Sequence, residues 1–252
     1  MKATDNIEYH SFRSSFNNSL LSHYPDPSLG YNSSRSGSDV LKVIEQFLEN
    51  TQVPVCGSVI HICLKRYPNE KNIENLIARI RQSHSTVAVV IPTKSSGGMY
   101  SQTMYNLATK TNGFGFFGDD ESGYDSYINL LEQTPYTTYS TNVNVSGHGS
   151  VNLPSMSVFP SIHEIFVTVQ DSGIISTFRN ISLTFHGPTD HYTMTPGPGV
   201  YPYSNFINDL HNFTDSKYSV ALNYHYSDSK QQTLQIRVNS LKKTNNWIPY
   251  AN

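Results

Sequence analysis

Charged side chains are scarce in this chain of 252 residues: they make up 14% of it, and the formal net charge is −2. A chain without net positive charge lacks the electrostatic field that draws proteins to nucleic acids or anionic membranes. No apolar run approaches the roughly 20 residues that a membrane-spanning helix requires. Residues 1–5 are polar and lack the apolar core of a signal peptide. We therefore expect no nucleic-acid partner and no membrane span.

Cysteine is also rare. The chain has two, Cys56 and Cys63, which are seven positions apart. In an extended stretch this separation spans about 23 Å at about 3.3 Å per residue, whereas a disulfide requires Cα atoms within about 7 Å. The two cysteines should not pair with each other. We expect Cys63 to be buried in a strand, and Cys56 to be free or paired with a cysteine outside this chain.

The clearest structural pattern runs from Ser58 to Gly113. Two apolar runs without polar alternation are each followed by a segment whose apolar residues recur every three or four positions. Unbroken apolar runs are typical of strands covered on both faces, as in parallel sheets, and the other spacing is typical of amphipathic helices. Shorter patterns of the same kinds flank this stretch. The expected elements are strands at 7–16, 58–64, 86–91 and 114–117, and helices at 38–48, 73–80, 100–108 and 124–131.

This alternation of strands and helices predicts the fold class of residues 1–134. It indicates an α/β domain with an open, mostly parallel sheet and helices on both faces. From Pro135 onward, segments of β-branched and aromatic residues are separated by clusters of Gly, Pro, Asn and Asp, and the expected strands lie at 136–140, 164–170, 174–185, 218–226 and 233–238. Short strands at such spacing predict an all-β antiparallel sandwich over residues 135–252. Within it, we expect Asn205 to His211 to form a single helical turn.

Three patterns resemble ligand sites, and a structural role is favoured for each. Residues 113–118 match G-x-G-x-x-G, but dinucleotide binding needs a strand before the glycines, and here a helix precedes them. His186, Asp190 and His191 lack a further nitrogen or sulfur ligand at a spacing recognisable for zinc, so we expect a polar turn. His61 lies in the middle of a strand and is expected to be a hydrogen-bonded core residue. We therefore expect no catalytic residue, no cofactor and no metal site.

Five Asn-x-Ser/Thr triplets provide a signal of a different kind. Such triplets accept N-linked glycans in secreted proteins, and there they lie on the surface. They favour an extracellular glycoprotein, as does the use of Tyr, Ser, Asn and Thr in place of charge. The candidate glycosylation sites are Asn17, Asn32, Asn144, Asn180 and Asn212.

Several segments resemble parts of a von Willebrand factor A domain. Gly37–Leu41 is similar to the loop and helix that carry the family's Gly-x-Thr motif, and Ser58–Leu64 is similar to the strand that ends in the family's Asp-Gly. More closely, Lys65–Glu70 and Thr103–Gly113 resemble secreted nematode proteins. In those proteins a von Willebrand factor A-like domain precedes an uncharacterised β-rich domain, sometimes linked to C-type lectin domains. The resemblance covers most of the chain.

The departures from this family concern its metal site and its first strand. Metal-binding members use Asp-x-Ser-x-Ser, a Thr and a later Asp. The first motif is absent here, Ser38 stands where the Thr belongs, and Lys65 stands near the later Asp. An ammonium would repel a divalent cation by about 4 kcal/mol for two unit charges at 4 Å and a dielectric of 20. We expect no metal-dependent adhesion site. The family's opening strand and helix are also missing, so we expect an incomplete domain from which upstream residues are lost.

The resemblance implies a non-catalytic extracellular protein for recognition or adhesion. It would be metal-independent, with an unknown protein or glycan ligand and no cofactor. The main alternative is an intracellular hydrolase or transferase with its site at the C-terminal ends of the parallel strands, where open α/β sheets bind ligands. A third reading is a decayed paralogue without independent function. Oligomeric state stays open. The alternative enzyme would draw on Lys65, Thr93, Ser95 and Ser96.

Overall fold

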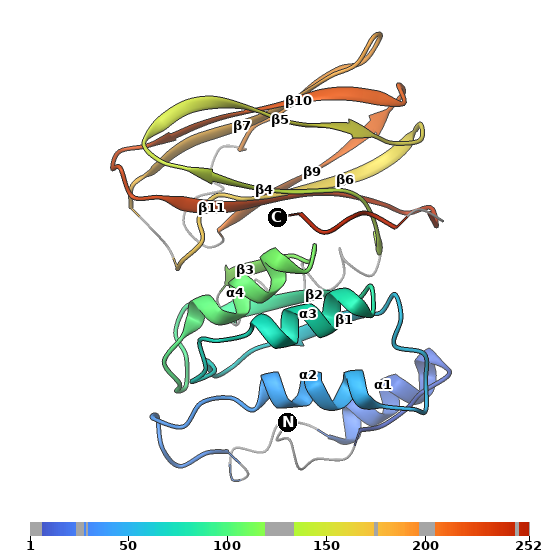
Figure 1. Cartoon of the computed structure of the whole chain (residues 1–252), viewed down its shortest axis with the longest axis vertical. Coiled ribbons are helices and arrows are strands. Elements are labelled where there is room, and N and C mark those ends of the chain that lie inside the picture. Colours follow the sequence, from blue (N-terminus) through green and yellow to red (C-terminus); the bar gives the residue numbers. More distant parts are fainter. Residues whose placement is uncertain are drawn as a thin grey trace.

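A computed structural model describes residues 7–23, 28, 30–118, 134–173, 176–196, 205–244 and 247–251 of the chain. Figure 1 shows two stacked parts, an α/β part and a β-sandwich, with the C-terminal segment lying between them. The helix expected at 124–131 lies outside the described residues.

The α/β part is built on a three-stranded parallel sheet of order β1-β2-β3. Its elements match the expected alternation of strands and helices, which confirms this part of the prediction. The elements are α2 (Val40–Glu49), β1 (Val59–Cys63), α3 (Glu74–Gln82), β2 (Thr86–Pro92), α4 (Ser101–Lys110) and β3 (Gly115–Gly118).

Helices on both faces of this sheet were expected, and within the described ranges that expectation is wrong. Buried side chains of α2, α3 and α4 form one cluster with Val87, Val89 and Ile91 of β2. Right-handed crossovers that proceed in one direction along a sheet place their helices on the same face. The order β1-β2-β3 does not reverse, so α3 and α4 lie on one side.

The sandwich covers part of the opposite face of the sheet. Ala88 and Val90 of β2 form a cluster with Phe114 and Phe116, which Phe166 and Phe206 of the sandwich complete. Phe116 and Phe206 have ring centroids 4.7 Å apart.

This cover does not extend over β1, the edge strand. Val59, His61 and Cys63 alternate along its exposed face, so the predicted burial of Cys63 and of His61 is wrong. The apolar run indicated a strand covered on both faces, but only Ile60 and Ile62 turn toward the helices. Both cysteine thiols are free and exposed.

The segment before α2 also differs from the prediction. A strand was expected at 7–16, but α1 (Arg13–Ser22) is a helix without a buried residue. Local hydrogen bonds explain the helix: the Phe16 N–H donates to the Phe12 carbonyl, and the Ser15 hydroxyl does the same. A strand would need a neighbour to satisfy these groups.

The sandwich consists of two four-stranded antiparallel sheets, of order β4-β11-β6-β9 and β5-β10-β7-β8. This confirms the all-β prediction for the C-terminal part. Inward side chains of both sheets form its core, among them Ile165, Leu183 and Ile236. The strands are β4 (Tyr136–Val145), β5 (His148–Ser157), β6 (Ser161–Thr168), β7 (Phe178–His186), β8 (His191–Met194), β9 (Phe206–Phe213), β10 (Lys217–Tyr226) and β11 (Gln232–Ser240).

The helical turn expected at Asn205 to His211 is wrong, because this segment belongs to β9. Ile207 and Phe213 turn into the core, and β9 pairs along its whole length with β6. Polar residues between these two positions concealed the alternation. The same reason explains why β5 and β8 were not predicted, since their outward residues are polar and β8 is only four residues long.

Arg237 of β11 lies at the junction between the two parts. Its side chain is 1% exposed. The guanidinium donates to the Gly113 carbonyl at 2.7 Å, to the Thr141 carbonyl at 2.8 Å and to the Asn142 side chain at 2.9 Å. Gly113 belongs to the α/β part and the other two to β4, so one side chain joins three segments.

The sandwich also protects the second edge of the parallel sheet. The Gly115 N–H donates to the Gln235 side chain at 2.8 Å, and the Phe117 N–H donates to the Asn205 side chain at 2.6 Å. An unpaired strand edge otherwise attracts other chains. Side-chain amides therefore occupy the place that a fourth strand would take.

The glycines of the G-x-G-x-x-G match have structural roles, as expected. Helix α4 ends before them and β3 contains the last two of them. A Cβ on Gly113 would lie 1.8 Å from the Val87 carbonyl oxygen. Close packing against β2 therefore requires glycine at 113.

Replacing Arg237 with Met should destabilise the protein by about 2–4 kcal/mol, because the Gly113 and Thr141 carbonyls would lose their donor in a buried place. Urea unfolding followed by circular dichroism measures this loss. Lys217→Met, at an exposed site on the other sheet, should change stability by less than about 0.5 kcal/mol. Equal stabilities of the Arg237→Met variant and the wild type would contradict the role assigned to the guanidinium.

Candidate functional site

The residues considered for an enzyme lie in the loops that follow β1 and β2. The Ser95 hydroxyl accepts hydrogen bonds from the Tyr67 and Gly97 N–H groups and donates to the Gly97 carbonyl. The Ser96 hydroxyl donates to the Lys65 carbonyl at 3.0 Å. The Tyr67 hydroxyl donates to the Pro92 and Thr93 carbonyls at 2.6 and 3.4 Å. These contacts fasten one loop to the other, and none joins a hydroxyl to a histidine or a carboxylate.

Ser38 and Lys65, the two degenerate metal-site positions, lie in neighbouring loops at this edge. The Ser38 N–H donates to the Tyr67 carbonyl at 2.9 Å, and its hydroxyl accepts from the Val40 N–H at 3.2 Å. Ser38 thus holds the start of α2 against the loop after β1. Throughout the described ranges, no group of three or more His, Cys, Asp or Glu side chains is arranged to hold a metal ion.

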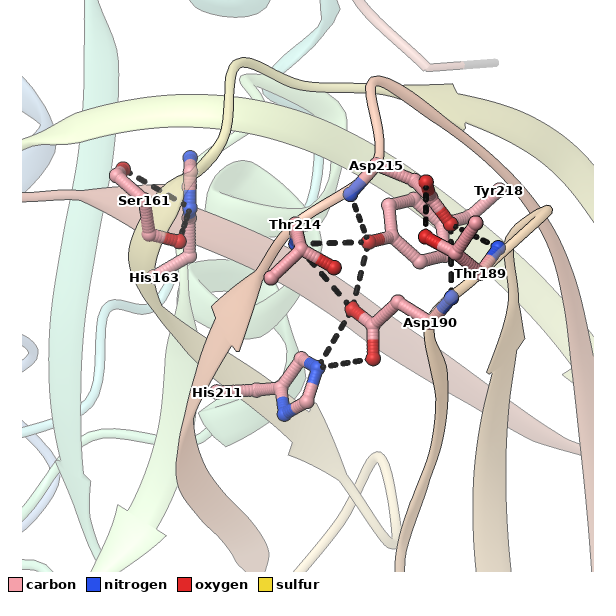
Figure 2. Close-up of polar contacts among 8 residues, drawn as sticks. All are labelled: Ser161, His163, Thr189, Asp190, His211, Thr214, Asp215 and Tyr218. Carbon is pink, nitrogen blue, oxygen red and sulfur yellow. Dashed lines mark hydrogen bonds and ion pairs between the residues drawn. The ribbon is translucent and has the colours of Figure 1, made fainter.

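Asp190 lies between His186 and His191 in the sequence, but the contacts of its carboxylate are with other residues. Figure 2 shows the Asp190 carboxylate facing His211 and Tyr218. The Tyr218 hydroxyl donates to it at 2.6 Å, and the His211 Nε2 lies 2.9 Å from it. The ring of His211 in turn stacks on Tyr192, with centroids 4.0 Å apart.

Asp215 closes the same network. Its carboxylate accepts hydrogen bonds from the N–H groups of Thr189 and Asp190 at 2.7 and 2.8 Å, while its own N–H donates to the Tyr218 hydroxyl (Figure 2). The turn after β7 and the turn after β9 are thereby held together. The network of Asp190, Asp215 and Tyr218 thus acts as a clamp between the two turns.

Burial alone would raise the pKa of Asp190. The hydrogen bonds from Tyr218 and His211 outweigh that effect and lower the pKa below its usual 3.8. The carboxylate is therefore charged in the folded protein at neutral pH.

His163 is a second buried histidine in this region. Its Nδ1 lies 3.0 Å from the Ser161 carbonyl, and its ring packs against Phe159 and Phe213 (Figure 2 shows the contact with Ser161). Burial lowers its pKa, so the imidazole is neutral at pH 7. Its Nε2 is buried without a hydrogen-bond partner, which costs free energy that the packing of the ring must offset.

The surface with the most unusual chemistry is the outward side of the sheet β5-β10-β7-β8, which we call the outer face. It points away from the α/β part, at the top of Figure 1. Inward residues such as Leu183 and Leu222 are buried, whereas the residues between them are exposed or half-buried. The outer face comprises His148, Ser150, Asn152, Asn180, Ser182, Thr184, His186, His191, Thr193, Ser219, Ala221, Asn223 and His225.

Apart from Ala221, these residues bear amides, hydroxyls and imidazoles, and none bears a carboxylate, ammonium or guanidinium. Lys217 and Arg179 lie only at the margins, and the Arg179 guanidinium donates to the Ser227 hydroxyl in the adjacent turn. Neighbours on the face contact each other: the Thr184 and Thr193 hydroxyls are 3.1 Å apart, and the Asn223 amide donates to the Ser182 hydroxyl at 3.3 Å.

Histidines occupy two corners of the outer face. His186 lies directly opposite His191 across β7 and β8, and His148 lies directly opposite His225 across β5 and β10. Of the outer-face residues, the sequence pattern singled out His186, His191 and Asn180, and it did not reveal that they share one surface. The alternation at 180–186 and 219–225 of polar residues with buried apolar ones is the signal that reveals it.

All five candidate glycosylation sites have exposed asparagines. Asn17 is in α1, Asn32 in the loop before α2, Asn144 near the end of β4, and Asn212 in β9. Asn180 lies on the outer face, opposite His225, and its side-chain oxygen accepts a hydrogen bond from the Ile181 N–H at 2.9 Å.

Comparisons with known proteins concern the sandwich. A sequence model of a domain of unknown function, DUF7154, matches residues 141–241. A search of curated proteins found no match.

Among solved structures, a carbohydrate-binding module of Cellvibrio mixtus lichenase 5A, solved with cellotriose, is 15% identical; the match covers 44% of this chain and 93% of that chain, with a TM-score of 0.23. A structure of carbohydrate-binding modules from the β-sandwich superfamily is 14% identical over 41% of this chain and 54% of that chain, with a TM-score of 0.24. The C-terminal domain of A223, a structural protein from Sulfolobus turreted icosahedral virus, is 12% identical. The match covers 40% of this chain and 98% of that chain, with a TM-score of 0.21. Likenesses this low carry no argument about a ligand.

The free energy of unfolding of the Asp190→Asn variant should fall less steeply on acidification than that of the wild type. Because the folded-state pKa of Asp190 is lowered, its contribution is present above about pH 3.8 and is lost as pH falls through the folded pKa. The difference in unfolding free energy between wild type and variant should therefore shrink as pH falls from about 5 toward 2. Urea unfolding at a series of pH values measures it. Tyr218→Phe, which removes one donor, should show a smaller effect of the same sign. A difference that stays constant with pH would contradict the clamp.

Proposed function

We propose that this protein is a non-catalytic recognition protein that binds neutral glycans on the outer face of its sandwich. The observation that supports this most is the chemistry of that face: exposed amides and hydroxyls, without a charge, on one continuous sheet surface. Asn, Ser and Thr side chains offer both donors and acceptors. Sugar hydroxyls need both, and an uncharged surface loses less hydration free energy than a charged one when they displace its water.

A protein ligand fits the outer face less well. The cores of protein interfaces are rich in Tyr, Trp, Phe, Met and Arg and poor in Ser. The outer face has the opposite composition, with Ala221 as its one aliphatic residue. The aromatic residues of the sandwich are instead core residues, as Phe185, Tyr218 and Tyr226 show.

The alternative of an enzyme at the C-terminal edge of the parallel sheet has weaker support. Ligand sites of open α/β sheets lie where the strand order reverses, and the described strands run β1-β2-β3 without a reversal. The hydroxyls of Ser95 and Ser96 bond to backbone groups of the loops.

The exposure of all five candidate glycosylation sites supports the extracellular part of the proposal. An N-glycan at Asn17, Asn32, Asn144 or Asn212 would leave both the core and the outer face uncovered. Within the described residues, no helix combines the length and apolar character that crossing a membrane requires. The resemblance to secreted nematode proteins with a von Willebrand factor A-like domain stays part of this proposal.

Asn223→Asp, near the middle of the outer face, should weaken binding to neutral oligosaccharides at least about tenfold. The new carboxylate cannot donate as the Asn223 amide does and loses more hydration on binding, which together cost about 1–3 kcal/mol. An array of neutral and anionic oligosaccharides, probed with the full chain made without N-glycans, identifies ligands. Calorimetric titration of the wild type and the variant then measures the affinities.

Asn212→Asp makes the same chemical change at an exposed position of β9, on the other sheet, and should leave affinity unchanged. Failure of the wild type to bind any neutral oligosaccharide would contradict the proposal. An equal loss of affinity in both variants would contradict the placement of the site.

A further inference from the structure

His186 and His191 form a pair of imidazoles that face each other on the outer face. They are exposed and directly opposite in the antiparallel register of β7 and β8. Their Nδ1 atoms are 2.8 Å apart, and their ring centroids are 5.0 Å apart. One ring nitrogen donates and the other accepts, so a shared hydrogen occupies the space between them.

The separation of the two nitrogens suits a transition-metal ion. Metal–nitrogen bonds to imidazole are about 2.0–2.1 Å long. Two such nitrogens are therefore about 2.9 Å apart in neighbouring positions of a square plane and about 3.3 Å apart in a tetrahedron. The observed 2.8 Å is close to the first value. Small rotations of two exposed side chains supply the difference.

The surroundings are compatible with a bound cation. The ammonium at this corner is that of Lys217, on β10 two residues before Ser219, the register partner of His186; it is exposed to solvent, where salt screens its repulsion of a cation. Nearby Asp190 turns to Tyr218 and His211, so its carboxylate is already engaged and is not a third ligand. The site would thus have two protein ligands and open positions.

We propose that His186 and His191 bind a divalent transition-metal ion of the kind that favours imidazole, such as Ni²⁺, Cu²⁺ or Zn²⁺. The ion would take the place of the shared hydrogen. The histidine that donates it moves that hydrogen to its Nε2, so both rings stay neutral and both Nδ1 lone pairs point to the ion. Water fills the open positions. This site does not depend on glycan binding.

The chain contains its own comparison in His148 and His225. They are also exposed, directly opposite in register and on the same face. Their ring centroids are 5.9 Å apart, compared with 5.0 Å for the first pair. The wider separation makes them the weaker pair, although the number and kind of side chains are the same.

The test is a calorimetric titration of tag-free protein with NiCl₂. Wild type should bind Ni²⁺, and the double variant His186→Gln/His191→Gln should lose at least about tenfold in affinity, because each imidazole is a ligand. The double variant His148→Gln/His225→Gln should keep the wild-type affinity. Thermal melting without metal checks that both variants fold, as exposed side chains permit.

Three results would overturn the proposal. The first is a wild type that binds no Ni²⁺ below millimolar concentration. The second is wild-type affinity in the His186→Gln/His191→Gln variant. The third is an equal or greater loss in the His148→Gln/His225→Gln variant, which would show that any two surface histidines suffice. None of these results bears on binding of neutral oligosaccharides, which Asn223→Asp tests separately.

Discussion

The buried guanidinium of Arg237 is the contact on which the arrangement of the two parts depends. It is 1% exposed and donates to the Gly113 carbonyl and to β4. A charge in such a place is tolerated only when hydrogen bonds compensate for lost hydration. Those hydrogen bonds require the loop before β3 to lie against β11. Position and orientation of the α/β part on the sandwich follow from that requirement, and Gln235 and Asn205 reinforce it at the edge of β3.

Because of this junction, the outward sides of the two sandwich sheets have different surroundings. Part of the outward side of β4-β11-β6-β9 contacts the α/β part, including the packing of Phe166 on Phe114, whereas Ile162 and Leu210 on the same side are exposed. The outward side of β5-β10-β7-β8 remains exposed to solvent. A ligand can bind to this second side without disturbing the junction. Its residues differ accordingly, since charge and aromatic groups lie at the junction, whereas amides, hydroxyls and imidazoles lie on the outer face.

Sequence patterns predicted the elements whose apolar residues are unbroken, alternate strictly or recur at helical spacing, such as β2, β11 and α3. The patterns gave wrong predictions where contacts between distant parts of the chain determine whether a residue is buried. Cys63 is exposed because the sandwich reaches β2 and not β1, and no local pattern contains that information. The alternation in segment 205–211 is hidden because polar Asp209 and His211 lie between Ile207 and Phe213 on the same side of β9. The outer face was missed for a similar reason: its residues lie on different strands, and only the strand register brings His186 to His191 and Asn223 to Ser182.

Site-resolved mass spectrometry of glycopeptides from the native protein tests the central claim most directly. The claim is that the protein is extracellular and that its outer face is open to a ligand. The account predicts N-glycans on one or more of Asn17, Asn32, Asn144 and Asn212, with Asn180 unmodified. A glycan on Asn180 would cover the row that contains His148 and His225, and would contradict the assignment of this face as the binding surface. A native protein without any N-glycan would contradict the extracellular part.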